Sequence, residues 1–389
     1  MMEFVKAHDL KRILGENLTD KQLRQQLLPQ AKIAANLPIN LNCVNRELVM
    51  NLAILSLYDL AVLIDDSISM EFEEAGKRKV AVKNVLAFIA DIYGAVSDKK
   101  RGISAIRFLN GNDDLDADNI MTAAEIDKVI DNHEFEGLTR IGTGLMQKIL
   151  KPFVFDQTVP WNKKSGEARK LKQLGRPLLI MVITDGAVEG EPPSRLRQAI
   201  QSVVDSLKRD NFDPKTTKAI AFQFARVGND RDAKKFLEHL DNKSSVKDYV
   251  DTLAGGDLME IMGMRTKDQA LTEKHQRRMI KLLLGPINSK YDKLPSKEKK
   301  QKPSEVETGY NSADDFNDED EDDEGEDDDE EDENNVDDDE DGNDSSVNRK
   351  QANQKQANRK QANQKQVNQR RSSNTGVHNS DGFYEVDSV

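Results

Sequence analysis

The chain has a single cysteine, Cys43, among 389 residues, and only 5% of its residues are aromatic. One thiol excludes an internal disulfide and a metal site built from several cysteines. No run of about 18 consecutive apolar residues occurs, so the sequence predicts no transmembrane helix and no membrane partner. Residues 1–15, MMEFVKAHDLKRILG, carry charges throughout and lack the apolar segment of a secretory signal peptide. We therefore expect a cytoplasmic or nuclear location.

Positive charge is absent from one long segment of the chain. Residues 314–344 contain 23 Asp and Glu and no Lys or Arg. Residues 349–371 show the opposite pattern, with eight Lys and Arg and no acidic residue. The net charge of -13 therefore comes from the C-terminal part, and residues 1–313 carry a small positive charge. A mildly basic body is weak support for nucleic-acid binding, which we do not expect.

Composition divides the chain into five segments. Residues 314–344 have too little apolar side chain and too much charge to form a core, so we expect them to be disordered. Residues 345–389 include the repeats QANQK, QANRK, QANQK and QVNQR, and this low-complexity sequence is also expected to be disordered. Residues 293–313 form a Lys- and Glu-rich linker, and residues 1–43 form a polar, weakly helical segment without an assigned role. This division leaves residues 44–292 as the folded domain.

Predicted strands and helices alternate within that domain. Tyr58–Ile64 and Leu178–Thr184 are nearly continuous apolar runs, typical of strands buried on both faces. Further strands are predicted over 103–109, 119–121 and 218–225, and helices over 46–55, 77–93, 123–130, 141–150, 194–207, 232–240 and 270–284. Two of these helices carry apolar stripes at helical spacing, at Val82, Val85, Leu86, Ile89 and Tyr93 and at Leu196, Ala199, Ile200, Val203 and Leu207. The alternation predicts an α/β three-layer sandwich, with a mostly parallel central sheet flanked by helices.

Oxygen-bearing side chains follow two of the predicted strands. Asp65, Ser67 and Ser69 come directly after the first apolar run, and Asp185 comes directly after the second. Thr139 lies in GLTRIGTGL, a glycine-containing segment that enters a helix. In open α/β sheets, ligands bind at the carboxyl ends of the strands, where both aspartates are expected. Hard oxygen donors favour Mg²⁺, Mn²⁺ or Ca²⁺ over zinc or copper.

These five positions together resemble the metal-ion-dependent adhesion site of von Willebrand factor type A domains. The chain is also similar to intracellular fungal members of this family over about residues 45–292, in the segments LYDLAVLIDDS, GLTRIGTGL, VITDGAVEGEP, IAFQFARVGND and KLLLGPINSKYD. It departs from the family pattern at Ile68, where Gly or Ser is commoner, and at Leu138, where many members have Gly.

The resemblance implies a role for each candidate residue. The hydroxyl groups of Ser67 and Ser69 would bind Mg²⁺ directly, and Thr139 would bind it directly or through water. Asp65 and Asp185 would balance the charge and orient the hydroxyls. An open position on the ion would accept an Asp or Glu carboxylate from a protein partner. The family resemblance thus predicts a metal-dependent protein-binding module and not an enzyme.

Other readings of the same residues stay open. The acidic tract 314–344 is an alternative functional element, as a scaffold or chaperone for basic proteins. A metal-assisted phosphatase is a further alternative, since an aspartate after a buried strand suits a nucleophile, although Ser67 stands where such a loop usually has a second Asp. The simplest alternative is that the five polar side chains only cap strand ends and helix starts. His133 has no second His at zinc-protease spacing, and we expect it on a loop surface.

Overall fold

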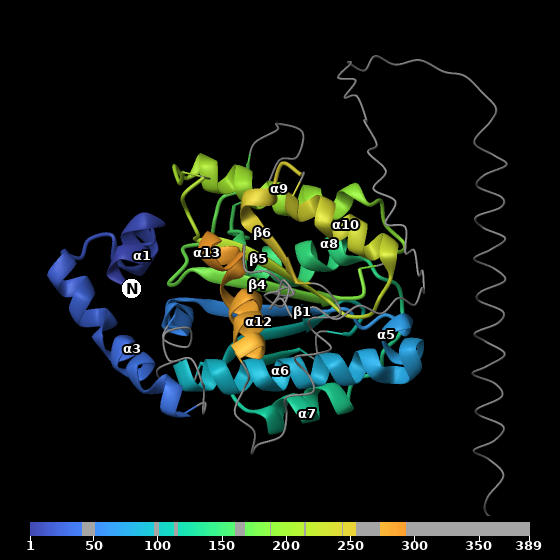
Figure 1. Cartoon of the computed structure of the whole chain (residues 1–389). Coiled ribbons are helices and arrows are strands. Elements are labelled where there is room, and N and C mark those ends of the chain that lie inside the picture. The colour runs from blue at the N-terminus through green and yellow to red at the C-terminus, as the bar shows by residue number, and fades with distance from the viewer. Residues whose placement is uncertain are drawn as a thin grey trace, which may run out of the picture. The chain divides into compact units, whose positions relative to one another are not determined.

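The computed structural model of the chain (Figure 1) places all of its described residues in one unit, Met1–Pro303. The acidic tract, the repeat segment, the linker 293–313 and Cys43 lie outside the described residues. No helix within the described part is long and apolar enough to cross a membrane. The described residues are 1–40, 51–96, 101–112, 116–159, 168–186, 188–213, 215–242, 244–253 and 273–292.

A six-stranded sheet with the order β3-β2-β1-β4-β5-β6 lies at the centre of the unit. Neighbouring strands are parallel except β2 and β3, which are antiparallel. Every residue of β4 and β5 is buried, as expected for central strands covered on both faces. The strands are β1 (Asp59–Ile64), β2 (Ile103–Phe108), β3 (Ala117–Ile120), β4 (Leu178–Thr184), β5 (Ile220–Arg226) and β6 (Val250–Leu253).

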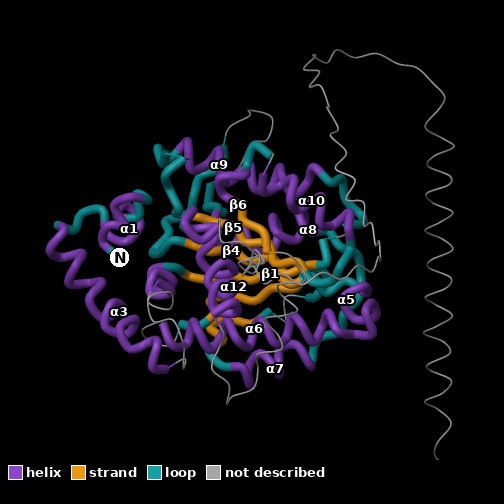
Figure 2. The backbone as a smooth tube through the Cα atoms, in the orientation of Figure 1, coloured by secondary structure: helices purple, strands orange, loops and turns teal. Residues whose placement is uncertain are grey.

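Helices cover both faces of the sheet, which confirms the predicted three-layer α/β fold (Figures 1 and 2). One face carries α6 (Lys77–Val96), α7 (Ala123–Asp131) and α12 (Glu273–Leu284). The other carries α8 (Ile141–Gly144), η4 (Leu145–Val154), α9 (Ser194–Arg209) and α10 (Arg231–Asn242). The predicted apolar stripes of α6 and α9 are buried throughout. The shorter elements are η1 (Leu52–Leu57), α5 (Ile68–Phe72), η2 (Glu73–Gly76), η6 (Lys247–Tyr249), η7 (Gly285–Ile287) and α13 (Ser289–Asp292).

Three elements differ from the sequence-based expectation. Strand β6 was not predicted, because its four residues VDTL are too few to show a pattern; it is placed by parallel pairing with β5. The helix expected to end before Pro152 continues to Val154 as the π-helix η4, with Pro152 inside it. The last turns there have left the α-helical register, in which an internal proline would clash with the preceding turn. Of the predicted helix 46–55, only the end is described, and Leu52–Leu57 is a 3₁₀ helix.

The N-terminal helices α1 (Met2–Ala7), α2 (Lys11–Gly15) and α3 (Asp20–Asn40) contribute to the main core. Arg12 of α2 donates hydrogen bonds to the Asn211 and Asp210 carbonyls at the end of α9. These helices therefore share a hydrophobic core with the predicted domain, and the predicted segment boundary at residue 43 lies outside the described residues. The buried N-terminal side chains in the cluster that also contains β1 and α6 are Val5, Leu10, Leu14, Leu23 and Leu27.

Two leucines of α3 provide a matched test of this packing. Leu23 is fully buried, whereas Leu28 is 51% exposed. We expect Leu23→Ala to lower the free energy of unfolding by about 2–5 kcal/mol, as for other buried leucines. Leu28→Ala is expected to change it by no more than about 0.5 kcal/mol. Urea denaturation followed by circular dichroism measures both values. Equal, small effects would show that α3 does not stabilise the domain.

Candidate metal-binding site

The centre of the sheet brings two predicted site residues to the same end. Strands β1 and β4 are parallel neighbours with Ile64 opposite Ile183, and the Asp65 amide continues the pairing by donating to the Ile183 carbonyl at 2.9 Å. After β1 the chain builds outward through β2, and after β4 it builds outward through β5 in the opposite direction. The gap between β1 and β4 is therefore the topological switch point, where open α/β sheets bind ligands. Asp65 and Asp185 both lie immediately beyond it.

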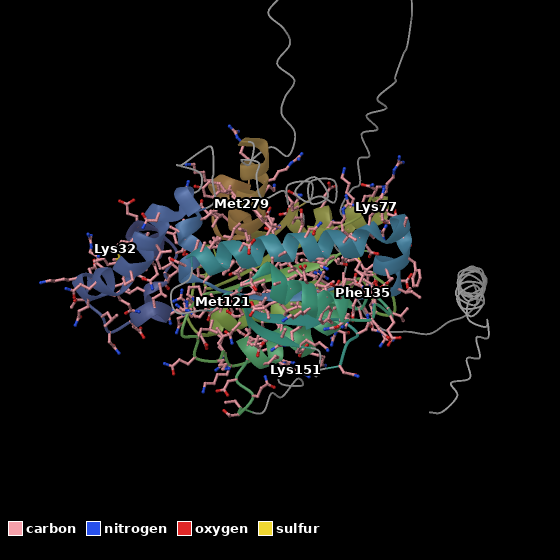
Figure 3. All side chains as sticks on the ribbon, turned by 90° about the horizontal axis from the view of Figure 1, so that it is seen from below. Lys32, Lys77, Met121, Phe135, Lys151 and Met279 are labelled. Atoms are coloured by element: carbon pink, nitrogen blue, oxygen red, sulfur yellow. The ribbon has the colours of Figure 1, made fainter. Side chains whose placement is uncertain are left out.

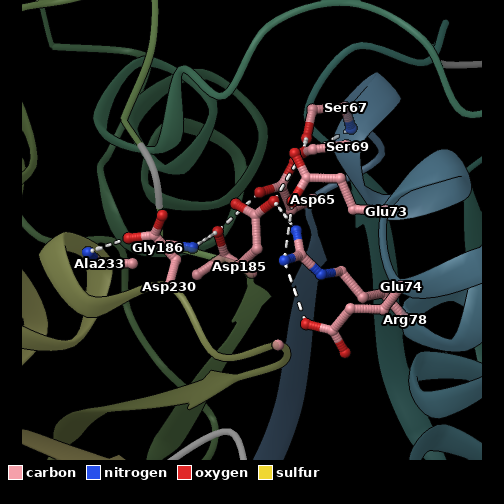
Figure 4. A network of polar contacts seen from close by, with 12 residues as sticks. Asp65, Ser67, Ser69, Glu73, Glu74, Arg78, Asp185, Gly186, Asp230 and Ala233 are labelled. Carbon is pink, nitrogen blue, oxygen red and sulfur yellow. Dashed lines mark hydrogen bonds and ion pairs between the residues drawn. The ribbon is translucent and has the colours of Figure 1, made fainter.

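Four of the five predicted residues form one hydrogen-bonded cluster at this point (Figure 4). The Ser67 amide donates to Asp65 Oδ1 at 3.0 Å, and the Ser67 and Ser69 hydroxyl oxygens lie 3.0 Å apart. Ser69 Oγ donates to Asp185 Oδ2 at 2.6 Å. Asp65, Ser67 and Asp185 are buried, whereas Ser69 is partly exposed. The cluster is thus a row of oxygen atoms that reaches solvent at Ser69.

Local backbone geometry holds the two aspartates in place. Ser67 is the N-cap residue of α5, so the chain turns into a helix directly after Asp65. Thr184 Oγ1 donates to Asp65 Oδ2 at 2.6 Å and accepts from the Gly186 amide at 2.9 Å. Gly186 has a φ of 82°, and a Cβ on it would lie 2.9 Å from the Ala233 side chain. Glycine is therefore required in the turn that directs Asp185 toward β1.

Thr139 is tied through its backbone to the loop that follows β4. Its carbonyl accepts a hydrogen bond from the Glu189 amide at 3.0 Å, which joins its loop to the loop after β4. The Glu191 carboxylate accepts from the Gly142 and Thr143 amides at 2.6 and 2.9 Å, at the N-terminus of α8. A carboxylate at this end of a helix is stabilised by the unpaired amides and the helix dipole. Thr139 is buried, and the side-chain hydrogen bonds described above connect the other four residues without it.

Electrostatics make the cluster a place that favours positive charge. Burial, together with the nearby Asp185 carboxylate, raises the pKa of Asp65 to about 7. Two carboxylates that are removed from water and close to each other destabilise each other's charged form. Arg78 of α6 relieves part of this, since its Nη1 donates to Asp185 Oδ2 at 2.9 Å. The sequence analysis did not identify Arg78, because no pattern along α6 marks it as different from its basic neighbours.

His133 is buried and paired, and the expectation that it lies on a loop surface was wrong. Its Nε2 lies 2.7 Å from Asp66 Oδ2, and its ring stacks on Phe108 with the centroids 3.5 Å apart. The Asn110 amide and side chain both donate to Asp66 Oδ1, at 2.8 and 3.0 Å. The pair therefore ties the loops after β1, β2 and α7 together. Nothing in the local sequence indicated this partner, 67 residues away in the chain.

The same end of the molecule can be followed in a view from below the sheet. Figure 3 shows Lys77, the first residue of α6, and Phe135 toward the same end. Lys79 of α6 reaches this loop, with its ammonium group 4.5 Å from the centre of the Phe135 ring and in hydrogen-bond contact with the His133 carbonyl. The loop that carries His133 is therefore fixed to α6 as well as to Asp66.

The donor set fits a hard divalent cation. Among the described residues, no group of three or more His, Cys, Asp or Glu side chains is arranged to hold a metal ion. The candidate set differs from such groups, since only Asp65 and Asp185 are carboxylates and the other members are hydroxyls. All of its donors are oxygen atoms, which suit Mg²⁺, Mn²⁺ or Ca²⁺. Burial and the nearby Asp185 carboxylate raise the pKa of Asp65, and a cation bound there would favour its charged form.

Comparisons with known proteins add little to this description. No protein-family model matches the chain, and no curated protein is significantly similar to it. Among solved structures, the chain is similar to one titled "Crystal structure of manganese-loaded Plasmodium vivax TRAP protein". The identity is 11% and the TM-score 0.28, over 53% of this chain and 71% of that chain. We draw no conclusion about fold or function from a similarity with so low a TM-score. The fold assignment rests on the sheet topology.

We expect Asp66→Ala to lower the free energy of unfolding by about 1–3 kcal/mol, because it leaves the buried His133 ring and the Asn110 donors without this acceptor. A suitable control is Asp118→Ala, whose side chain is 57% exposed and pairs with Arg107. The control should change stability by no more than about 0.5 kcal/mol. Urea denaturation measures the free energy of unfolding of both variants. If the two variants were equally stable, the buried pair would not anchor these loops.

Proposed function

We propose that this chain binds a protein partner through a divalent cation, preferentially Mg²⁺, with Mn²⁺ or Ca²⁺ as substitutes. The ligands would be Asp65, Ser67, Ser69, Thr139 and Asp185, as in the von Willebrand factor type A domains that the sequence resembles. One observation carries the proposal: carboxylate and hydroxyl oxygens from the residues that follow β1 and β4 and from the start of α5 form a connected cluster at the topological switch point. A location in the cytoplasm or nucleus remains part of the proposal.

The hydroxyl and carboxylate groups of the site would play different roles in binding the cation. The Ser67 and Ser69 hydroxyls are neutral donors, so a bound cation would keep enough positive charge to attract a partner carboxylate. Asp65 and Asp185 supply the balancing negative charge. Thr184 and Gly186 hold those carboxylates in position through the hydrogen bonds and the tight turn described above. This arrangement suits reversible binding, because the protein contributes an incomplete oxygen shell.

Apolar side chains beside the cluster support a protein as the partner. Ile68 and Phe72 are 40% and 48% exposed, which is unusual for large apolar residues. They are four residues apart on α5, so they share one face of that helix. This helix begins immediately after Ser67. We propose that the partner places an apolar side chain on Ile68 and Phe72 next to the Asp or Glu that reaches the cation.

The alternatives make different use of the chain. A scaffold or chaperone for basic proteins would rely on the acidic tract 314–344, which lies outside the described residues. A metal-assisted phosphatase would need Asp65 to attack a phosphate ester. However, the Asp65 carboxylate already accepts hydrogen bonds from the Ser67 amide and the Thr184 hydroxyl. These donors occupy both of its oxygens and reduce its nucleophilicity, so binding is the better-supported function.

The metal site can be tested with Mn²⁺ alone. We expect the full chain to bind one Mn²⁺, as measured from the electron paramagnetic resonance signal of the free ion. Asp185→Asn should abolish this binding while keeping the size of the side chain, because it removes half of the balancing charge. Asp131→Asn serves as the control, since that side chain is 60% exposed and pairs with Lys83 on the surface. Equal Mn²⁺ binding by Asp185→Asn and the unchanged chain would rule out the site.

Partner binding can be separated from the acidic tract in a pull-down from cell extract. A partner held by the metal site should be retained with Mg²⁺, lost with EDTA and lost in Asp185→Asn. It should also persist after deletion of residues 308–389. Phe72→Ser should weaken its retention, whereas Leu28→Ser, which alters an equally exposed leucine on α3, should not. A partner that ignores EDTA and needs residues 308–389 would favour the scaffold function instead.

A further inference from the structure

We infer that Arg78 is a built-in competitor for the metal ion, so that cation binding at the cluster requires its guanidinium to leave Asp185. The inference rests on the proposed metal site and adds a means of regulating it. Its basis is a contact at the cluster itself: Asp185 Oδ2 accepts hydrogen bonds from both Ser69 Oγ, at 2.6 Å, and Arg78 Nη1, at 2.9 Å. The same carboxylate oxygen thus accepts hydrogen bonds from Ser69, a proposed metal ligand, and from Arg78, a protein cation.

Two cations on one carboxylate repel each other strongly here. The Arg78 and Asp185 side chains are 5% and 2% exposed, so water screens little of the interaction between them. A divalent ion held by Ser69 and Asp185 would stand beside the guanidinium charge. Arginine does not lose its proton in proteins, and therefore it cannot avoid this repulsion by becoming neutral. The remaining way to relieve it is for the guanidinium to move.

The hydrogen bonds of Arg78 allow such a movement. Nη1 contacts Asp185, whereas Nη2 contacts Glu73 at 2.9 Å and Glu74 at 3.3 Å (Figure 4). The Glu73 and Glu74 side chains are 59% and 27% exposed, so they draw the guanidinium toward solvent. Nε has no hydrogen-bond partner within the described part of the structure. Arg78 can therefore release Asp185 and remain paired with two carboxylates of its own segment.

The segment that carries these glutamates is strained. Glu74 and Ala75 in η2 have φ values of 53° and 57°, in the left-handed region that is unfavourable for residues with a Cβ. The strained turn brings Glu74 Oε1 to Arg78 and also to the Asn229 amide, at 3.2 Å. The guanidinium packs directly on Gly228, where an added Cβ would lie 2.6 Å from Nε.

Arg78 therefore holds η2 in place, and η2 directly follows α5. Any shift of the guanidinium away from Asp185 alters the support of this turn, which begins one residue after Phe72. Metal binding at Asp185 and the position of the exposed apolar face of α5 are coupled through one side chain. This coupling through Arg78 makes partner binding depend on the cation in two ways. The partner carboxylate binds the open position on the ion, and the partner's apolar side chain depends on the position of α5.

The test measures Mn²⁺ affinity and melting temperature for the full chain and for charge variants at this position. Arg78→Gln should bind Mn²⁺ about tenfold more tightly, a typical size for coupling between two binding events. It should melt at a lower temperature than the unchanged chain without Mn²⁺ and show a larger increase on Mn²⁺ addition. Arg78→Lys keeps the charge and should bind Mn²⁺ with an affinity close to that of the unchanged chain. Arg107→Gln, which removes a paired arginine of β2, should leave the affinity unchanged.

A further variant covers the case in which Arg78→Gln fails to fold. Glu74→Gln removes one of the two carboxylates that compete with Asp185 for the guanidinium, so it should weaken Mn²⁺ binding several-fold. Unchanged or weaker Mn²⁺ binding by Arg78→Gln, or unchanged binding by Glu74→Gln if the first does not fold, overturns the competition while leaving the metal site intact. If no variant binds Mn²⁺ and the unchanged chain does not either, the metal site itself fails, and this inference fails with it.

Discussion

The negative charge that two buried aspartates bring to the end of the sheet is the constraint on which the surrounding structure depends. Asp65 and Asp185 are almost fully removed from water, and the effect of burial and of Asp185 appears in the raised pKa of Asp65. Buried carboxylates need donors, and α5, β4, α6 and the loop after β1 supply them. The hydroxyls of Ser69 and Thr184, the Ser67 amide and the Arg78 guanidinium all point at these two groups. The end of the sheet is organised around acceptors that its own donors only partly neutralise.

Polar contacts between segments far apart in the chain hold the loops around this cluster in place. His133 binds Asp66, and Glu191 caps the start of α8. Close backbone approach adds to these contacts, since a Cβ on Gly142 would lie 2.5 Å from the Leu196 amide nitrogen. The sheet supplies the rigid frame, and these anchors hold the oxygen atoms within it. Such preorganisation is what a site needs if it is to bind a cation without first reordering its ligands.

A binding function agrees with the distribution of side chains around the cluster. The oxygen atoms become accessible at Ser69, next to the exposed apolar face formed by Ile68 and Phe72. A partner that presented a carboxylate beside an apolar group would complement both features. Arg78 places a protein cation at the same point, next to the strained turn η2. The site thus combines a proposed ligand set with a protein cation that we propose competes with the metal ion.

Local sequence by itself determined the strands β1, β4 and β5, the buried stripes of α6 and α9, and four of the residues that meet in the cluster, because each follows from a short-range pattern. Strand β2 and the helices α7, α10 and α12 were also predicted from local sequence. Other features were decided only by tertiary structure. Strand β6 exists because β5 offers an edge to pair with, and the N-terminal helices join the core through scattered leucines that show no clear period. The partnerships of His133 with Asp66 and of Arg78 with Asp185 join residues 67 and 107 positions apart. No local pattern encodes such contacts, since their energy depends on burial that arises only when the sheet and its loops have assembled.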